Sequence, residues 1–130
     1  MGERRAITTP DAPAAAGPYS QAIRAGDLVF AAGQLGLDPA TGEFTADDVA
    51  GQAERALANL EAILVAAGSG LDQLVKTTVF LADIGDWPAI NEVYARMVPQ
   101  PFPARSAFAV KDLPKGGRVE IEAVATVRAG

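Results

Sequence analysis

Hydrophobic residues recur at every second position in some segments of the chain and at every third or fourth position in others. Alternation is typical of a half-buried β-strand, whereas the longer spacing is typical of an amphipathic helix. Residues 19–24 and 28–36, separated by a turn around Gly26, predict a pair of antiparallel strands. Residues 75–84 are rich in β-branched side chains and predict a further strand.

The strongest helical pattern begins after Thr45, which we expect to cap the helix, with Asp48 completing a capping-box-like pattern. Gly68 is expected to end this helix. A second, shorter helix is predicted after Asp86, with Pro88 tolerated in its first turn. Both helices have one apolar stripe, which consists of Val49, Ala53, Ala56, Leu57, Leu60, Ile63, Leu64 and Ala67 in the first and of Trp87, Ile90, Tyr94 and Met97 in the second.

Two strands are predicted at the end of the chain, at residues 105–110 and 118–128. Alternation in the last strand places Glu120 and Glu122 together on the face opposite its apolar residues. Because strands, helix, strand, helix and strands follow one another, we expect an α+β fold in a single domain, residues 1–130, with helices on one face of the sheet.

Charge and composition exclude several classes of function. The 130-residue chain has a net charge of −5, and its basic residues are scattered, so we expect no nucleic-acid partner. Without histidine or cysteine the chain has no Ser-His-Asp or Cys-His system, no disulfide and no His- or Cys-ligated zinc. No segment approaches the roughly 20 apolar residues of a membrane span, so we expect no membrane partner and a cytoplasmic location.

Candidate chemistry lies in the two predicted C-terminal strands. A short turn makes these strands expected neighbours, which would put Arg105 and Glu120 within side-chain reach of each other. Arginine binds a carboxylate bidentately, and a partly desolvated glutamate moves protons to and from water near neutral pH. An Arg–Glu pair across two strands is also a common structural ion pair, and the residues alone leave both interpretations open.

Longer motifs resemble the Rid family, the reactive-intermediate deaminases of RidA/YjgF type. The resemblance covers nearly the whole chain and is strongest at "FPARSAFAVKDLPKGGRVEIEAVA", with further matches at "APAAAGPYSQA", "AAGQLGLDPATGE", "VKTTVFLADI" and "NEVYARM". It implies a chorismate-mutase-like mixed sheet with two helices packed on one face. It also implies a homotrimer with active sites between subunits. The implied reaction, hydrolysis of enamines and imines such as 2-iminopropanoate and 2-iminobutanoate to 2-oxo acids and ammonia, needs no cofactor and no metal.

The resemblance also implies roles for individual residues. Arg105 would hold the substrate carboxylate, and Glu120 would position the attacking water and manage its protons. Tyr19 would close the pocket and Asn91 would help to line it. The backbone groups of Gly33 and Ala107 would contact the ligand.

Two positions depart from the pattern of many RidA-type proteins. Ala32 stands where a serine is common and Ala107 where a cysteine is common, which removes a hydroxyl and a thiol from the implied pocket. The substrate preference is therefore open. Alternative functions are a 2-oxo-acid-binding regulatory trimer without turnover, a deaminase of another enamine such as aminoacrylate, and an endoribonuclease, which the acidic chain disfavours.

Overall fold

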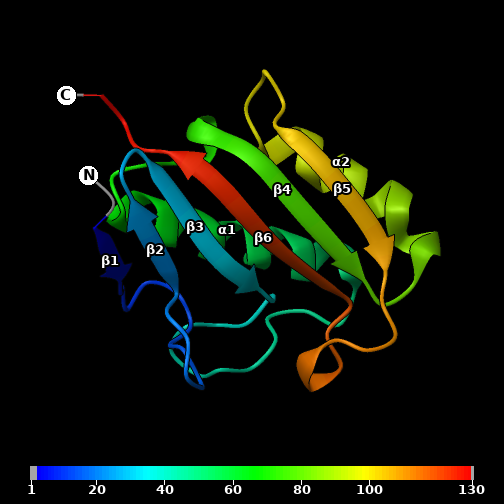
Figure 1. Cartoon of the computed structure of the whole chain (residues 1–130). Coiled ribbons are helices and arrows are strands. Elements are labelled where there is room, and N and C mark those ends of the chain that lie inside the picture. The colour runs from blue at the N-terminus through cyan, green and yellow to red at the C-terminus, as the bar shows by residue number, and fades with distance from the viewer. Residues whose placement is uncertain (1–2, 130) are drawn as a thin grey trace.

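The computed structural model describes residues 3–129, which form one six-stranded sheet and two α-helices (Figure 1). The strands lie side by side in the order β1-β2-β3-β6-β4-β5. All neighbours are antiparallel except β4 and β5, which are parallel. The strand bounds are β1 Arg4–Ile7, β2 Ala22–Ala25, β3 Leu28–Gln34, β4 Leu74–Leu81, β5 Ala104–Ala109 and β6 Val119–Thr126.

Both helices, α1 (Val49–Ala66) and α2 (Trp87–Met97), lie behind the sheet in the view of Figure 1, which confirms the predicted α+β class. Short 3₁₀ turns lie at η1 (Leu71–Gln73), η2 (Ile84–Asp86) and η3 (Pro114–Gly116). The core is formed by the predicted stripe of α1 and by alternate residues of the central strands, because each of these faces is apolar. Its fully buried side chains include Leu57, Leu60, Ile63, Leu64, Val79, Leu81 and Ile121.

Helix α1 begins later than predicted. Its N-cap is Asp48, not Thr45, and the Asp48 side chain makes no capping hydrogen bond. The end of the helix agrees with the sequence: the cap residue is Ala67, and Gly68 follows with φ of +83°, a backbone conformation that glycine adopts without strain.

The last two strands are not neighbours, and the expectation that they pair is wrong. Strand β5 pairs with β4 in parallel, while β6 pairs with β4 on its other side and with β3. The segment β4–α2–β5 is a crossover in which a helix connects two parallel strands, and this connection fixes β5 beside β4. Strand β4 therefore separates β5 from β6.

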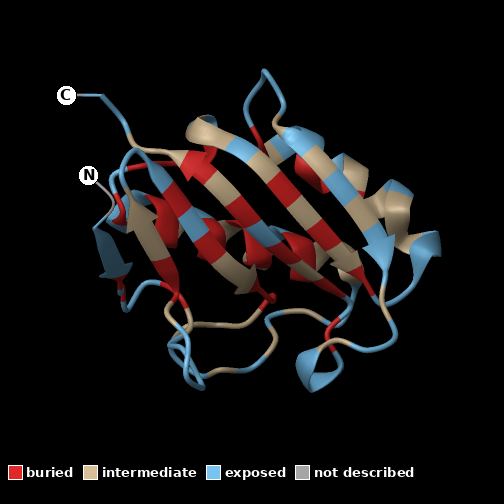
Figure 2. Ribbon diagram, viewed as in Figure 1, coloured by how far each residue is buried: buried red, intermediate tan, exposed pale blue. Residues whose placement is uncertain are grey.

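The sheet face opposite the helices is covered by no described helix (Figure 1), and exposed positions alternate with buried ones along its strands (Figure 2). Leu28, Phe30 and Phe108 are 37%, 46% and 46% exposed. Phe108 packs edge-on against Phe80 with ring centroids 5.4 Å apart. We call this surface the open face.

The N-terminal edge differs from the prediction. Strand β1 was not predicted, because only Ile7 of its four residues is buried and no alternation is visible in the sequence. Strand β2 begins at Ala22, so residues 19–21 belong to the preceding loop instead of the strand predicted from residue 19. Within residues 3–129, no helix combines the length and the apolar character that crossing a bilayer requires.

Candidate active site

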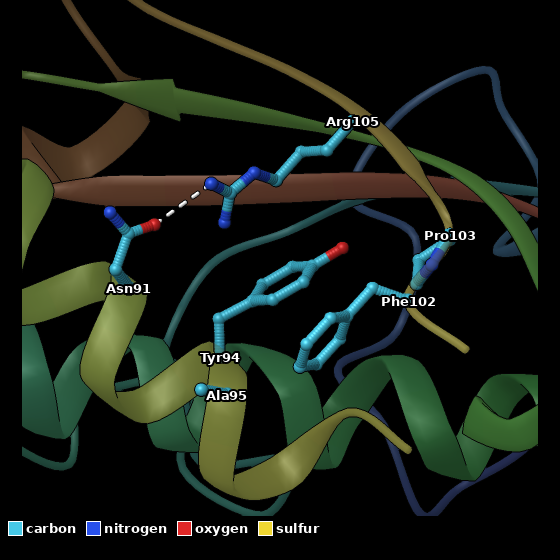
Figure 3. A pocket seen from close by; sticks show the side chains of 6 residues that line it. All are labelled: Asn91, Tyr94, Ala95, Phe102, Pro103 and Arg105. Carbon is cyan, nitrogen blue, oxygen red and sulfur yellow. Dashed lines mark hydrogen bonds between the residues drawn. The ribbon is translucent and has the colours of Figure 1, made fainter. Parts of the chain in front are cut away.

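The Arg105 guanidinium lies between the sheet and α2, above the ring of Tyr94 (Figure 3). It also stacks on a second aromatic ring, that of Trp87. Its central carbon is 4.6 Å from the ring centroid of Trp87 and 4.6 Å from that of Tyr94. A guanidinium over an aromatic face is held by the ring quadrupole. Trp87 and Tyr94 are seven positions apart on α2, which places both rings on the helix face that meets β5.

A hydrogen bond fixes the orientation of the guanidinium within this clamp. The Arg105 Nη2 donates to Asn91 Oδ1 over 2.8 Å, as Figure 3 shows. Tyr94 is in turn held by Thr77, whose hydroxyl lies 2.7 Å from the phenol oxygen; burial raises the pKa of Tyr94, so the phenol stays neutral. The remaining guanidinium N–H groups have no acceptor among the described residues and are free to bind an anion. They lie beside a cavity of about 460 Å³ lined by Asn91, Tyr94, Ala95, Phe102, Pro103 and Arg105.

Glu120 projects from β6 toward the open face, because its neighbours Val119 and Ile121 point into the core. It lines a second cavity of about 460 Å³. Burial raises the pKa of the Glu120 carboxyl, and repulsion from the Glu122 carboxylate raises it further. A carboxyl with a raised pKa is suited to exchange protons with a reacting group near neutral pH.

Gly33 makes room for this carboxyl. A Cβ atom at Gly33 would lie 2.7 Å from Glu120 Oε2 and 2.9 Å from its Cδ, closer than real side-chain contacts allow. The register of β3 with β6 shifts between Ala31 and Gln34, so Gly33 sits within an irregularity of the ladder. The residue that was predicted to offer its backbone to a ligand therefore also sets the position of the catalytic candidate.

Tyr19 lines the same cavity from a loop that precedes β2. Tyr19 is 54% exposed, and its hydroxyl accepts a hydrogen bond from the Ala16 backbone N–H over 3.2 Å. The loop is anchored by the buried Gln21 side chain, whose amide oxygen accepts from Thr9 N–H and whose amide nitrogen donates to carbonyls of the loop. The Gln21 backbone carbonyl accepts from Ala32 N–H, which joins this loop to the strand that carries Gly33.

One chain does not bring Arg105 and Glu120 together. Arg105 pairs with Thr77 on one side of β4 and faces the helices, whereas Glu120 pairs with Phe80 on the other side and faces away from them. Asn91 lies with Arg105, whereas Tyr19 and Gly33 lie with Glu120. Ala107 is in β5, two residues beyond Arg105 and half-buried against the core.

The chain matches known proteins over most of its length. The family model described as Endoribonuclease L-PSP matches residues 9–127. The chain belongs to this family. This membership confirms the resemblance to the RidA/YjgF proteins, since a crystal structure of RidA from Psychrobacter superposes with a TM-score of 0.92 at 45% identity, covering 95% of this chain and 99% of that one.

Curated relatives of the family are also similar in sequence. The RutC family protein y4sK of Sinorhizobium fredii is 58% identical, over 91% of this chain and 94% of the relative. A goat protein with the name 2-iminobutanoate/2-iminopropanoate deaminase is 52% identical, over 94% of this chain and 89% of the relative.

Three residues that lie beside Arg105 or Glu120 in this structure were not among the predicted site residues. Trp87 and Tyr94 were predicted only as part of the apolar stripe of the second helix. The helical period does bury Tyr94, but the same period also aligns both rings with Arg105. Lys115, which lies within the C-terminal motif, was given no role, although it lines the Glu120 cavity. Across residues 3–129, no three acidic side chains converge as a metal site would require.

Proposed function

We propose that this chain is a deaminase that hydrolyses small 2-imino acids to 2-oxo acids and ammonia. The observation that carries the proposal is the pair of groups at the two cavities: a guanidinium with unused donors, and a carboxyl whose pKa is raised. The name and the 52% identity of the goat relative support the same reaction. 2-Iminopropanoate and 2-iminobutanoate are the substrates that this name indicates.

The chemistry assigns one task to each group. The Arg105 fork binds the substrate carboxylate and fixes the imine carbon in place. Glu120 accepts a proton as water adds to the C=N carbon, and a proton is returned to the nitrogen, which leaves as ammonia when the carbonyl forms. Acid–base catalysis of this kind contributes about 10²–10⁴-fold, a useful acceleration for an imine that also hydrolyses unaided.

The assembly we infer is a homotrimer in which each site lies between two subunits. Separation of Arg105 and Glu120 within one chain supports this assembly, because a complete site then needs Arg105 of one copy beside Glu120 of another. Exposed Leu28, Phe30 and Phe108 on the open face also support it, since large apolar side chains exposed on a sheet face that no helix covers are typical of subunit interfaces.

Activity is tested by coupling the protein to a threonine dehydratase and following 2-oxobutanoate. The parent protein should accelerate release of 2-oxobutanoate, whereas Arg105→Ala and Glu120→Gln should each lose the acceleration. Arg5→Ala, which removes a positive charge from the exposed β1, is the matched control and should keep it. An Arg105→Ala variant as fast as the parent contradicts the assigned role.

Two other functions are outcomes of the same experiment. Tight binding of 2-oxobutanoate without acceleration indicates a regulatory binding protein. The family description names an endoribonuclease, so RNA cleavage is measured in parallel. If the parent protein cleaves RNA but hydrolyses no imine, and Glu120→Gln abolishes the cleavage, the protein is an endoribonuclease instead.

A further inference from the structure

The cavity that holds Glu120 contains one cation that the proposed reaction does not use. Among the described residues that line it, Lys115 and Glu120 are the charged ones. Lys115 belongs to the turn η3, which precedes β6, and its side chain reaches across to the loop around Gly42. A cation and the catalytic carboxyl therefore share one cavity within a single chain.

The backbone at Lys115 has an unusual conformation. Its φ is +58°, and it is the one residue other than glycine with positive φ between residues 3 and 129. Left-handed backbone is unfavourable for a residue with a long side chain and is concentrated at functional sites. Pro114 and Gly116 on either side make the tight turn, so a glycine or asparagine would fit the Lys115 position more easily.

The charge of Lys115 has no counter-ion in the described part of the chain. Its Nζ donates one hydrogen bond, over 3.0 Å, to the carbonyl oxygen of Gly42. The ion pairs of residues 3–129 join Arg96 to Glu54 and Arg128 to Asp72, so neither involves Lys115. An ammonium has three donors, and two of these remain for an anion.

Glu120 does not neutralise this cation. A lysine close enough to pair with a carboxylate lowers its pKa, but burial and Glu122 raise the pKa of Glu120. The ammonium is therefore free to bind an anionic group of a ligand that is already in contact with Glu120.

We propose that Lys115 binds a second, distal carboxylate of the substrate, so that the site accepts dicarboxylic 2-imino acids such as 2-iminosuccinate and 2-iminoglutarate. The inference rests on the proposed function, in which Arg105 takes the carboxylate next to the imine carbon. The distal carboxylate accepts a charge-assisted hydrogen bond from Nζ, while the bond to Gly42 is kept. Lys115 is then a residue that determines specificity, and the hydrolysis at the imine carbon is unchanged.

The test compares two substrates that an amino-acid oxidase generates in place, 2-iminosuccinate from aspartate and 2-iminopropanoate from alanine. Lys115→Asn removes the charge and keeps a residue that tolerates left-handed backbone. It should lower kcat/KM for 2-iminosuccinate by about tenfold or more and leave that for 2-iminopropanoate within about twofold. Lys115→Arg should keep most of the activity on both substrates. Lys111→Asn, an equal charge change at an exposed position of the segment that connects β5 to β6, should change neither.

Results of two kinds overturn the inference. An equal loss on both substrates in Lys115→Asn means that Lys115 binds the carboxylate common to both or shapes the cavity. No loss on either substrate means that it binds neither. If the parent protein hydrolyses no imine, the proposed function fails, and calorimetry then tests the role of Lys115 alone. For the inference to stand, the ratio of the affinity for 2-oxoglutarate to that for 2-oxobutanoate must fall about tenfold in Lys115→Asn.

Discussion

The two cavities hold their charged groups by different means. Around Arg105, side chains do the positioning: two rings and one amide of α2 surround the guanidinium. Around Glu120, the backbone does it, because the carboxyl lies against Gly33 and under loops that Gln21 anchors. The position of Arg105 therefore depends on side-chain contacts with one helix, whereas the position of Glu120 depends on how closely two strands approach. Substitutions at the two cavities should therefore change activity in different ways.

The sharpest test of this comparison asks whether the two cavities work in one chain or between chains. Arg105→Ala and Glu120→Gln alone should each lose about 10²-fold or more in kcat/KM, because a charged partner of the substrate or the proton carrier is removed. Co-expression of the two variants should restore activity, since some sites then combine an intact Arg105 with an intact Glu120 from different copies. In a random mixture about a quarter of the sites are complete, half of one group times half of the other.

Co-expression of Arg105→Ala with itself is the control and should stay inactive. Recovery by the mixed oligomer, measured as 2-oxobutanoate release per subunit, supports shared sites. If the mixture stays as inactive as each variant, the two groups do not meet between copies, and the separation within one chain becomes an argument against the mechanism.

The next largest effect is expected at the backbone contact of Glu120. Gly33→Ala adds a methyl group 2.7 Å from Glu120 Oε2 and forces the carboxyl to move. Moving the Glu120 carboxyl away from its position beside Gly33 should lower kcat by about 10- to 100-fold. At Gly17 an added Cβ would lie 3.6 Å from its nearest neighbour, an ordinary contact, so Gly17→Ala is the matched control for the loss of a glycine.

The melting temperature separates this effect from unfolding. Because Glu120 faces away from the core, Gly33→Ala should leave the cooperative melting transition intact while activity falls. A variant that keeps full kcat shows that the carboxyl position is not set by Gly33.

The sequence predicted most elements and the charged candidates Arg105 and Glu120, but not their arrangement or the other side chains that line the two cavities. Periodicity is a local property, so it locates α1 and β6 and places Glu120 on the face away from the core. Strand pairing is not local. The short turn between the predicted strands 105–110 and 118–128 suggested that these strands are neighbours, yet the longer β4–α2–β5 segment decides which strands pair. That signal was present in the sequence, because strand–helix–strand connections favour parallel pairing.

The clamp around Arg105 shows a second limit. An aromatic side chain on the apolar face of a helix is usually a core residue, and Tyr94 is indeed buried. Only the parallel pairing of β5 with β4 reveals that Arg105 faces the same helix. The function of the two rings thus followed from tertiary structure and not from spacing.

A smaller effect is expected when the clamp itself is weakened. Trp87→Leu keeps an apolar side chain but removes one aromatic face from Arg105, so KM should rise about three- to tenfold with a smaller change in kcat. Trp87→Phe retains a ring and should restore KM to near the parent value. Equal KM values for the leucine and phenylalanine variants would show that the ring does not hold the guanidinium.

The smallest effect concerns the proton balance at Glu120. Burial is the larger cause of its raised pKa, and the charge of Glu122 is the smaller, so Glu122→Gln should lower the pKa only in part. If the carboxylate form takes the proton from water, the acidic limb of the kcat/KM profile should move to lower pH in this variant. Glu61→Gln, the same change on the exposed side of α1, should leave the limb in place.

The same substitution has a consequence for stability whose sign is fixed by the direction of the shift. A carboxyl whose pKa is raised by folding favours the native state below its unfolded pKa and loses that contribution as pH rises through the folded pKa. Glu122→Gln should therefore reduce the decline in the free energy of unfolding between the unfolded and the folded pKa of Glu120, measured by urea titration at several pH values. A limb that moves without this change in stability assigns the titration to a group other than Glu120.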